Sequence, residues 1–337
     1  FQNEAALEER KAYFAQKIFS QKSPEHGFRQ HAKRAYPAYA ATDVDIWLEI
    51  EKDEEANLAL SPEEAQLLQN IHAAEKEEES YPLFINGRAG SGKSTMLQYL
   101  MSDYLGKAIQ QDSPSLLPLY MTCSENLLSY ARKRISRLLT TRVDNLMRRS
   151  SQESQDSSSP LEESLARSFA VFRHFLLAAL PEERLSSFSE EKLVDYASFR
   201  TLWNREVRHP KALKVGPELS WHTIRTYIKG RRPSLEEYFS PEQFEMLPQK
   251  SRSISMNTYR EVWEHVWESW YKGRTSLEKE DSLWDDQDLA AEVLYGGYLA
   301  SKDRYAAIFC DEAQDFTSLE LEVVVQLSRF SHKRILP

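Results

Sequence analysis

Cysteine, long apolar runs and a surplus of positive charge are scarce or missing in this chain of 337 residues. Its two cysteines, Cys123 and Cys310, have no CxxC partner, which argues against a disulfide framework or a zinc site. This usage favours a reducing, intracellular compartment, cytoplasmic or nuclear. Each cysteine ends an apolar run, so we expect both to be small buried side chains. No run approaches the ~20 apolar residues of a membrane span, and we expect no membrane partner.

The net charge of −9 excludes a generally basic nucleic-acid coat. The charges are nevertheless unevenly distributed, because the segment 75–79 is acidic whereas the segment 132–149 is rich in arginine. Local charge governs contacts with phosphate, so a nucleic-acid track is compatible with this balance. A solvated helix face explains most of these arginines equally well.

A phosphate-binding motif is the strongest signal in the sequence. Residues 87–94 fit the pattern GxxxxGK[ST], after the apolar run 83–85, for which we predict a central parallel strand, and before a helical pattern that we expect Gly106 to end. In such a loop, glycines let backbone N–H groups surround phosphates, a lysine reaches the outer phosphates and a hydroxyl binds Mg²⁺. The predicted ATP-binding residues are Gly87, Arg88, Ala89, Gly90, Ser91, Gly92, Lys93, Ser94 and Thr95.

An acidic pair, Asp311-Glu312, follows the predicted strand 305–310. One carboxylate there can hold the shell of Mg²⁺, and the next can orient the attacking water. A capping box, Thr317 with Glu320, predicts that a helix follows. Because 218 residues separate Lys93 from Asp311, far more than a minimal parallel sheet needs, we expect a helical insertion between them.

The sequence therefore predicts an α/β fold with four parts. Residues 1–58 form a helical N-terminal extension, 59–140 the first part of the nucleotide-binding domain, 141–300 the helical insertion and 301–337 the second part. We predict a strand at 117–122, one helix through Leu161, Leu165, Phe169, Phe172 and Leu176, and a mobile loop at 150–160. An aromatic stripe at 259–270 has the spacing of one helix face, which favours core packing over base stacking.

The motifs resemble motifs I and II of UvrD/Rep-type superfamily I helicases. The likeness is carried by Asn86–Thr95 and by Asp311-Glu-Ala-Gln-Asp315, whose glutamine is typical of that superfamily. Residues 119–124 resemble motif Ia, Trp284–Leu289 an Asp-x-x-Asp-Leu element, and Leu60–Glu64 the lead-in to the Q motif. Residues 223–230 resemble a divergent branch found in large TPR-and-ankyrin-repeat proteins.

This resemblance implies a P-loop, RecA-like sheet that binds ATP and Mg²⁺. Lys93, Asp311, Glu312 and Gln314 would be catalytic, with Ser94 and Asp311 holding the metal. Thr122, Ser124 and Arg134 would contact single-stranded DNA or RNA. Glu64 stands where the family has an adenine-reading glutamine, so Gln66 is our candidate for that role. We expect the chain to be one lobe of a longer protein, because Pro337 lies 22 residues after Asp315 and neither motif III nor a second RecA-like lobe with an arginine finger is present. One lobe alone should hydrolyse ATP weakly.

Two functions from different classes follow. The first is an ATP-driven helicase or translocase that moves on single-stranded nucleic acid. The second is a regulatory ATP-binding module that controls a partner or an attached domain without unwinding. The acidic charge, the altered Q motif and the serine-rich loop are compatible with the second, whereas the intact Glu312 favours the first.

Overall fold

The computed structural model describes residues 84–87, 92–111, 113, 116–147, 160–275, 282–299 and 305–328. The predictions for residues 1–58, for Gln66 and for residues 88–91 lie outside these ranges. The described residues belong to two units. The first holds residues 84–87, 92–107 and 129–147, and the second holds the remainder. Within the described ranges, no helix combines the length and the apolar character needed to cross a membrane.

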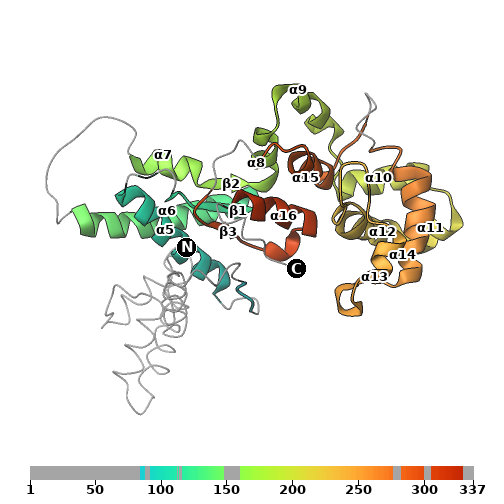
Figure 1. The fold of residues 1–337 in the computed structure, drawn as a ribbon, viewed down its shortest axis with the longest axis horizontal. Coiled ribbons are helices and arrows are strands. Elements are labelled where there is room, and N and C mark those ends of the chain that lie inside the picture. The colour runs from blue at the N-terminus through green and yellow to red at the C-terminus, as the bar shows by residue number, and fades with distance from the viewer. Residues whose placement is uncertain are drawn as a thin grey trace, which may run out of the picture. The chain divides into compact units, whose positions relative to one another are not determined.

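A small parallel sheet organises the second unit (Figure 1). Its three strands are β1 (Leu119–Thr122), β2 (Phe169–Val171) and β3 (Ile308–Cys310), in the order β2-β1-β3. Tyr120 pairs with Phe169 on one side and with Phe309 on the other. The chain is thus a mixed α/β protein that is mostly helical, as predicted at this coarse level. Pro118 lies immediately before β1, where its missing N–H interrupts no ladder.

Three predictions of local structure were wrong. The single helix expected from Leu161 to Leu176 is a helix, a strand and a second helix: α7 (Pro160–Arg167), β2 and α8 (Phe172–Ala179). The buried strand expected at 83–85 is absent from its described residues, and Phe84 is 79% exposed. Short apolar segments cannot by periodicity alone distinguish strand from helix, and a strand exists only where a partner accepts its hydrogen bonds.

The third wrong prediction concerns Gly106, which does not end its helix. The helix α5 runs from Lys93 to Gln110, and Gly106 lies inside it. A Cβ built at Gly106 would meet the Leu139 side chain at 3.7 Å, an ordinary contact distance. Leu139 belongs to α6 (Glu125–Met147), so α6 passes close to α5 at Gly106. Packing against a neighbouring helix therefore outweighs the modest cost of an interior glycine.

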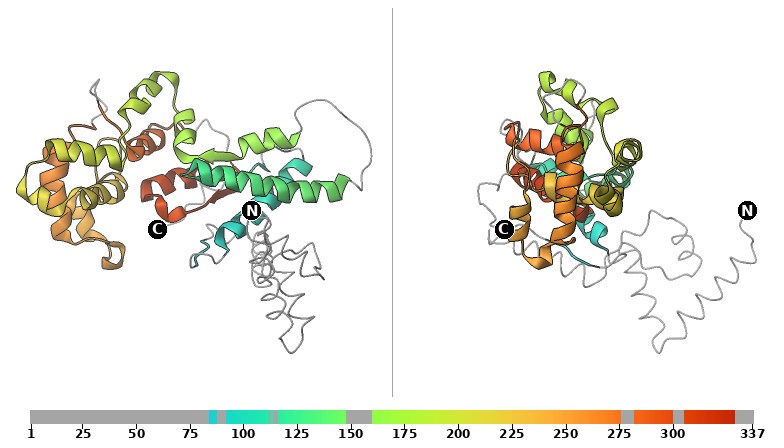
Figure 2. Two further views of the ribbon diagram at one scale, coloured as in Figure 1. Left: turned by 180° about the vertical axis from the view of Figure 1, so that it is seen from behind. Right: turned by 90° about the vertical axis from the view of Figure 1, so that its right-hand side faces the viewer.

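One face of the sheet packs on three helices (Figure 2). These are α8, α15 (Asp286–Tyr295) and α16 (Ser318–Leu327), whose apolar side chains form one core with Leu119 and Met121 of β1. The helix α16 begins at the predicted capping box, in which the Thr317 hydroxyl accepts from the Glu320 N–H and the Glu320 carboxylate accepts from the Thr317 N–H. This confirmed cap places the N-cap of α16, Thr317, two residues after Asp315.

A second core of the same unit is rich in aromatic side chains. It lies among the remaining helices and includes the buried Tyr259, Val262, Val266 and Trp267, so the aromatic stripe is core packing, as favoured above. Its helices are α10 (Tyr196–Glu206), α11 (Pro210–Val215), α12 (Pro217–Thr223), α13 (Pro241–Met246), α14 (Met256–Val262) and the π-helices η5 (Ile224–Lys229) and η7 (Trp263–Tyr271). Along the chain, α9 (Glu182–Leu185) and the 3₁₀ turns η3 (Ser186–Phe188) and η4 (Glu190–Lys192) lie between α8 and α10, and Phe188 of η3 belongs to the first core.

Candidate functional site

Of the phosphate-binding motif, the structure describes Gly87 and residues 92–94, at the start of the helix α5. Gly92 has φ of 83°, a conformation that glycine adopts without strain. Its carbonyl accepts the first helical bond, from Met96 N at 2.9 Å. The Lys93 ammonium donates to the Gly87 carbonyl at 2.8 Å. The first and the seventh residue of the motif therefore lie close together at the N-terminal end of α5.

The ammonium, the hydroxyl and the helix end at this motif fit a nucleoside triphosphate with Mg²⁺. Lys93 supplies a positive charge, and Ser94 supplies a hydroxyl in the first turn of α5, where Thr95 also lies. The N-terminal end of a helix carries partial positive charge, which stabilises a bound anion. Arg88, Ala89, Gly90 and Ser91 lie outside the described residues. The loop can thus hold phosphate through Lys93 and the metal through Ser94.

The acidic turn, which we define as Asp311–Asp315, follows β3 in the second unit. Its first carboxylate is held by two donors. The Tyr120 hydroxyl, from the middle strand, donates to Asp311 Oδ2 at 2.9 Å. The Glu312 N–H donates to Asp311 Oδ1 at 3.1 Å. Because both oxygens are oriented by neighbours, Asp311 is in a defined position to act as a metal ligand.

The backbone at Glu312 is in a conformation that side chains rarely adopt. Among the described residues, Glu312 is the one non-glycine residue with a positive φ, at 53°. Such a conformation costs on the order of 1–3 kcal/mol and is typical of active sites. The next residues form the 3₁₀ turn η8 (Ala313–Asp315), from which the Gln314 amide donates to Glu312 Oε2. The strained backbone and Gln314 together orient an exposed carboxylate.

The three predicted nucleic-acid contacts differ in accessibility. Thr122, at the carboxyl end of β1, is 1% exposed, and its hydroxyl accepts from Ser124 N at 3.4 Å. Ser124 is partly exposed, and its hydroxyl accepts from Leu127 N at 3.4 Å near the start of α6. In the first unit, Arg134 is buried and stacks on the ring of Tyr130, 4.8 Å from its centroid. Ser124 is therefore the most accessible of the three.

Cys123 is a correction to the expectation that both cysteines are buried. It is exposed, and Cys310 is partly buried. Cys123 is the first residue after β1, so it is no longer enclosed by sheet neighbours on both sides. Although the residue as a whole is exposed, partial desolvation of its sulfur and the nearby carboxylate of Glu320 raise the pKa of Cys123 to about 12. Burial likewise raises the pKa of Cys310 to about 12. Both cysteines are therefore neutral thiols at neutral pH.

Sequence reasoning missed the residues that support the acidic turn. Tyr120 holds Asp311, and Arg225 of η5 donates to the Asp315 carbonyl at 3.0 Å. The signal for Tyr120 was a polar hydroxyl in a strand that is otherwise buried and apolar. The signal for Arg225 was its place in the segment 223–230, which had been set apart by resemblance alone.

The comparisons with known proteins give no match. No protein-family model, no curated protein and no solved structure matches this chain.

Proposed function

We propose that this chain is the ATP-binding lobe of an ATP-dependent nucleic-acid helicase or translocase with a P-loop, RecA-like fold. It would hydrolyse ATP with Mg²⁺ and move on single-stranded DNA or RNA, together with a second RecA-like lobe. The support is the complete phosphate-binding motif, the parallel sheet that carries the acidic turn, and the resemblance of both motifs to UvrD/Rep-type helicases.

Each residue has a role that follows from its chemistry. Lys93 would neutralise the outer phosphates, and Ser94 would supply a hydroxyl ligand to Mg²⁺. Asp311 would supply a carboxylate ligand to the metal. Glu312 orients and deprotonates the attacking water, because its carboxylate is accessible and its geometry is fixed. Gln314 contacts Glu312 and is therefore suited to couple the phosphate site to the nucleic acid. Bound Mg²⁺ would neutralise charge on the phosphates during in-line transfer.

The observation that carries the proposal is the left-handed backbone at Glu312. A strained residue persists only where the surrounding structure determines its conformation, and such residues cluster at active sites. A pure nucleotide sensor has no need of a positioned base. This favours hydrolysis over binding alone.

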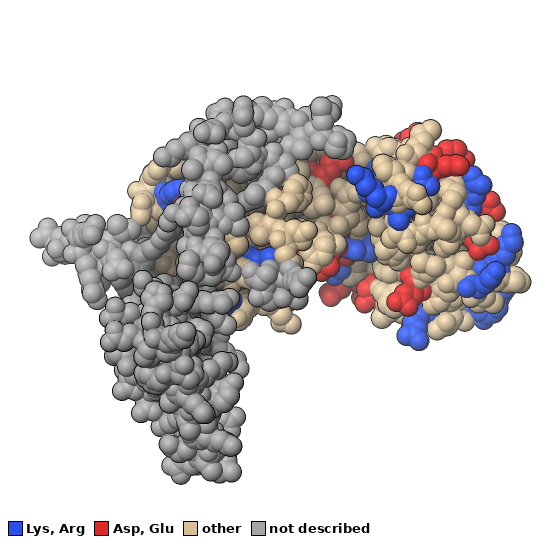
Figure 3. All heavy atoms as spheres, turned by 90° about the horizontal axis from the view of Figure 1, so that it is seen from below, with Lys and Arg blue, Asp and Glu red and all other residues tan. Residues whose placement is uncertain are grey.

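The regulatory module remains the second candidate because of the distribution of charge. On the face shown in Figure 3, Lys and Arg side chains of the α10–α14 region are interspersed with Asp and Glu and form no single basic patch. Thr122 and Arg134 are also buried. A surface of this kind fits a protein partner as well as it fits a phosphate backbone.

ATP turnover by the full-length protein distinguishes the two candidates. It is measured with Mg²⁺, with and without single-stranded DNA or RNA, alongside Lys93→Ala as a control that loses phosphate binding. Stimulation of tenfold or more by one nucleic acid is the result we expect. Tight ATP binding with slow, unstimulated turnover would establish the regulatory module, and failure of the wild type to bind ATP would overturn both candidates.

A further inference from the structure

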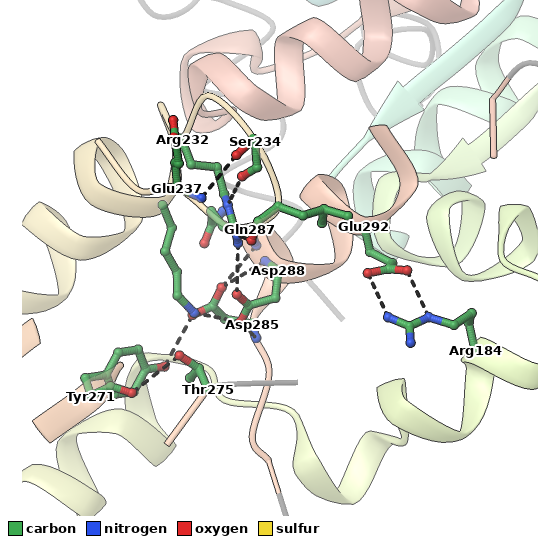
Figure 4. A network of polar contacts seen from close by, with 12 residues as sticks. Arg184, Arg232, Ser234, Glu237, Tyr271, Thr275, Asp285, Gln287, Asp288 and Glu292 are labelled. Carbon is green, nitrogen blue, oxygen red and sulfur yellow. Dashed lines mark hydrogen bonds and ion pairs between the residues drawn. The ribbon is translucent and has the colours of Figure 1, made fainter. Parts of the chain in front are cut away.

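Three segments that are distant in sequence meet at a buried group of polar side chains, which we call the polar junction. It comprises Lys229, Asp285, Asp288, Gln287 and Glu320. Lys229 donates to Asp285 and Asp288, each at 2.6 Å, and Gln287 Nε2 donates to Glu320 at 3.1 Å. Figure 4 shows Asp285, Gln287 and Asp288 side by side at the start of α15. The junction therefore links η5, α15 and α16.

Arg225 connects this junction to the acidic turn. Its Nη2 donates to the Asp315 carbonyl at 3.0 Å and lies 3.5 Å from Glu320 Oε2. Glu320 cannot move easily, because its side chain is 2% exposed and also accepts from the Thr317 N–H and from Gln287. One guanidinium nitrogen thus bridges the last residue of η8 and a fixed carboxylate.

The C-terminal end of η5 is hydrogen-bonded to the start of α16, which holds the backbone from which the Arg225 side chain extends. The Gly230 carbonyl accepts from Leu319 N at 2.8 Å. A Cβ at Gly230 would lie 2.9 Å from the Thr317 Cβ and 2.2 Å from the Arg225 carbonyl, so no larger residue fits without movement. A π-helix such as η5 is itself uncommon and is often found at functional sites.

We propose that Arg225 is a positioning residue for the acidic turn and therefore for Glu312. This inference rests on the proposed function, in which Glu312 is the base. The path is short: Arg225 holds the Asp315 carbonyl, and the Asp315 N–H donates to the Glu312 carbonyl at 2.9 Å. Without the guanidinium, the 3₁₀ turn loses its anchor to the helical region, and the left-handed conformation at Glu312 is no longer determined.

The chain offers a matched control in Arg184. Its side chain is 37% exposed against 31% for Arg225, and each pairs with a nearly buried glutamate. Arg184 bonds to Glu292, at 2.9 Å through Nε, and both are labelled in Figure 4. These bonds of Arg184 go to Glu292 and not to the acidic turn. Arg184→Ala therefore removes a comparable ion pair without releasing the turn.

The experiment compares Arg225→Ala, Arg225→Lys and Arg184→Ala in the full-length protein. For Arg225→Ala we expect kcat for ATP to fall about 10- to 100-fold with KM within about twofold, as for a residue that acts through positioning. Added guanidinium should restore part of kcat in this variant alone. Arg225→Lys keeps a charge beside Glu320 but loses the planar fork, so we expect an intermediate kcat. Arg184→Ala should keep kcat within about twofold.

Amide hydrogen exchange separates this inference from the proposed function, because it needs no activity. Without nucleotide, the amides of residues 312–316 should exchange at least about tenfold faster in Arg225→Ala than in Arg184→Ala, since they open locally. If the wild type lacks ATPase activity but this difference is seen, the proposed function fails and the positioning role stands. Equal exchange and equal kcat in the Arg225→Ala and Arg184→Ala variants would overturn the role of Arg225.

Discussion

The acidic turn and the polar junction both present carboxylates, but in opposite settings. In the acidic turn, Glu312 is exposed and its backbone is left-handed. In the polar junction, Asp285 and Asp288 are buried in regular helix-start geometry, where each forms a capping bond and an ion pair with Lys229. Burial and the neighbouring Asp285 raise the pKa of Asp288 to about 7, against the opposing effect of Lys229.

The difference shows how the same side-chain chemistry is given two roles. A buried carboxylate that is matched by a buried cation holds segments in register and has no access to substrate. An exposed carboxylate on a strained backbone gains no stability from its position, so its conformation requires another explanation. Local rules are broken mainly at functional sites. The polar junction therefore has a structural role, and the acidic turn is where we propose that the chemistry takes place.

Removing the cation of the junction should have the largest effect on stability. Burial alone would lower the pKa of Lys229. The carboxylates of Asp285 and Asp288 outweigh this effect and raise the pKa, so Lys229 is a charged ammonium. Lys229→Met leaves these two carboxylates without their principal partner and should reduce the free energy of unfolding by about 3–5 kcal/mol. Urea denaturation measures this. Lys272→Ala, which breaks the exposed pair with Glu268, is the control and should change stability by at most about 0.5 kcal/mol. Equal losses of stability in the Lys229→Met and Lys272→Ala variants would show that the buried ion pairs of the polar junction contribute no more than an exposed pair.

Cys123 reports on the surroundings of the acidic turn. Because its pKa is raised from 9.0 to about 12, its thiolate fraction at pH 8 is about 10³-fold lower than that of an ordinary thiol. Because a more basic thiolate is also more nucleophilic, alkylation by iodoacetamide, followed by mass spectrometry, should be slower by about 10- to 100-fold in the native protein than in urea. As long as the pH is below the pKa, the alkylation rate should rise about tenfold for each unit by which the pH is increased. Equally fast native labelling would show that burial and the nearby carboxylates do not act on the sulfur.

The hydroxyl of Tyr120 should set the affinity for the metal at Asp311. Tyr120→Phe removes the 2.9 Å bond to Oδ2 and keeps the ring. We expect the Mg²⁺ concentration for half-maximal turnover to rise about 10- to 100-fold, as for other residues that orient a metal ligand. The Mg²⁺ dependence of thermal stabilisation by ATP should shift in parallel. Tyr227→Phe removes a buried hydroxyl that bonds to Ser253 and should leave both midpoints unchanged.

Relief of the backbone strain at Glu312 should have the smallest of these effects. It should raise the free energy of unfolding, whereas Lys229→Met should lower it. Glycine adopts the left-handed conformation without a clashing Cβ, so Glu312→Gly should stabilise the fold by about 1 kcal/mol while abolishing turnover. Glu312→Gln keeps the Cβ and serves as the control that gains nothing. A loss of stability in the glycine variant, seen by urea denaturation, would show that the backbone at this residue is not strained.

The sequence predicted those features that depend on local chemistry. The strand before Asp311, the Thr317–Glu320 capping box and the aromatic core all agree with the structure. Each is encoded within a few residues, by an apolar run, a reciprocal hydrogen bond or one helical face.

The features that the sequence could not predict depend on long-range pairing. The strand Phe169–Val171 was taken for helix because its identity comes from bonding to β1, and the exposure of Phe84 reflects the lack of any such pairing within residues 84–87. Likewise, Lys229 meets Asp288 and Arg225 meets Asp315 across 59 and 90 residues. The ATP, Mg²⁺ and nucleic-acid roles stay predictions, since they concern molecules outside the chain.

Single-turnover ATP hydrolysis by Glu312→Gln in the full-length protein tests most directly whether the exposed carboxylate of the acidic turn takes part in the chemistry. Glutamine keeps the size and the backbone but cannot accept a proton from water. We predict that ATP·Mg²⁺ binds with an affinity within about twofold of the wild type, while the hydrolysis rate falls about 10²–10⁴-fold, the range for loss of a general base. An unchanged rate would contradict the account, because the strained, exposed carboxylate would then have no part in the chemistry.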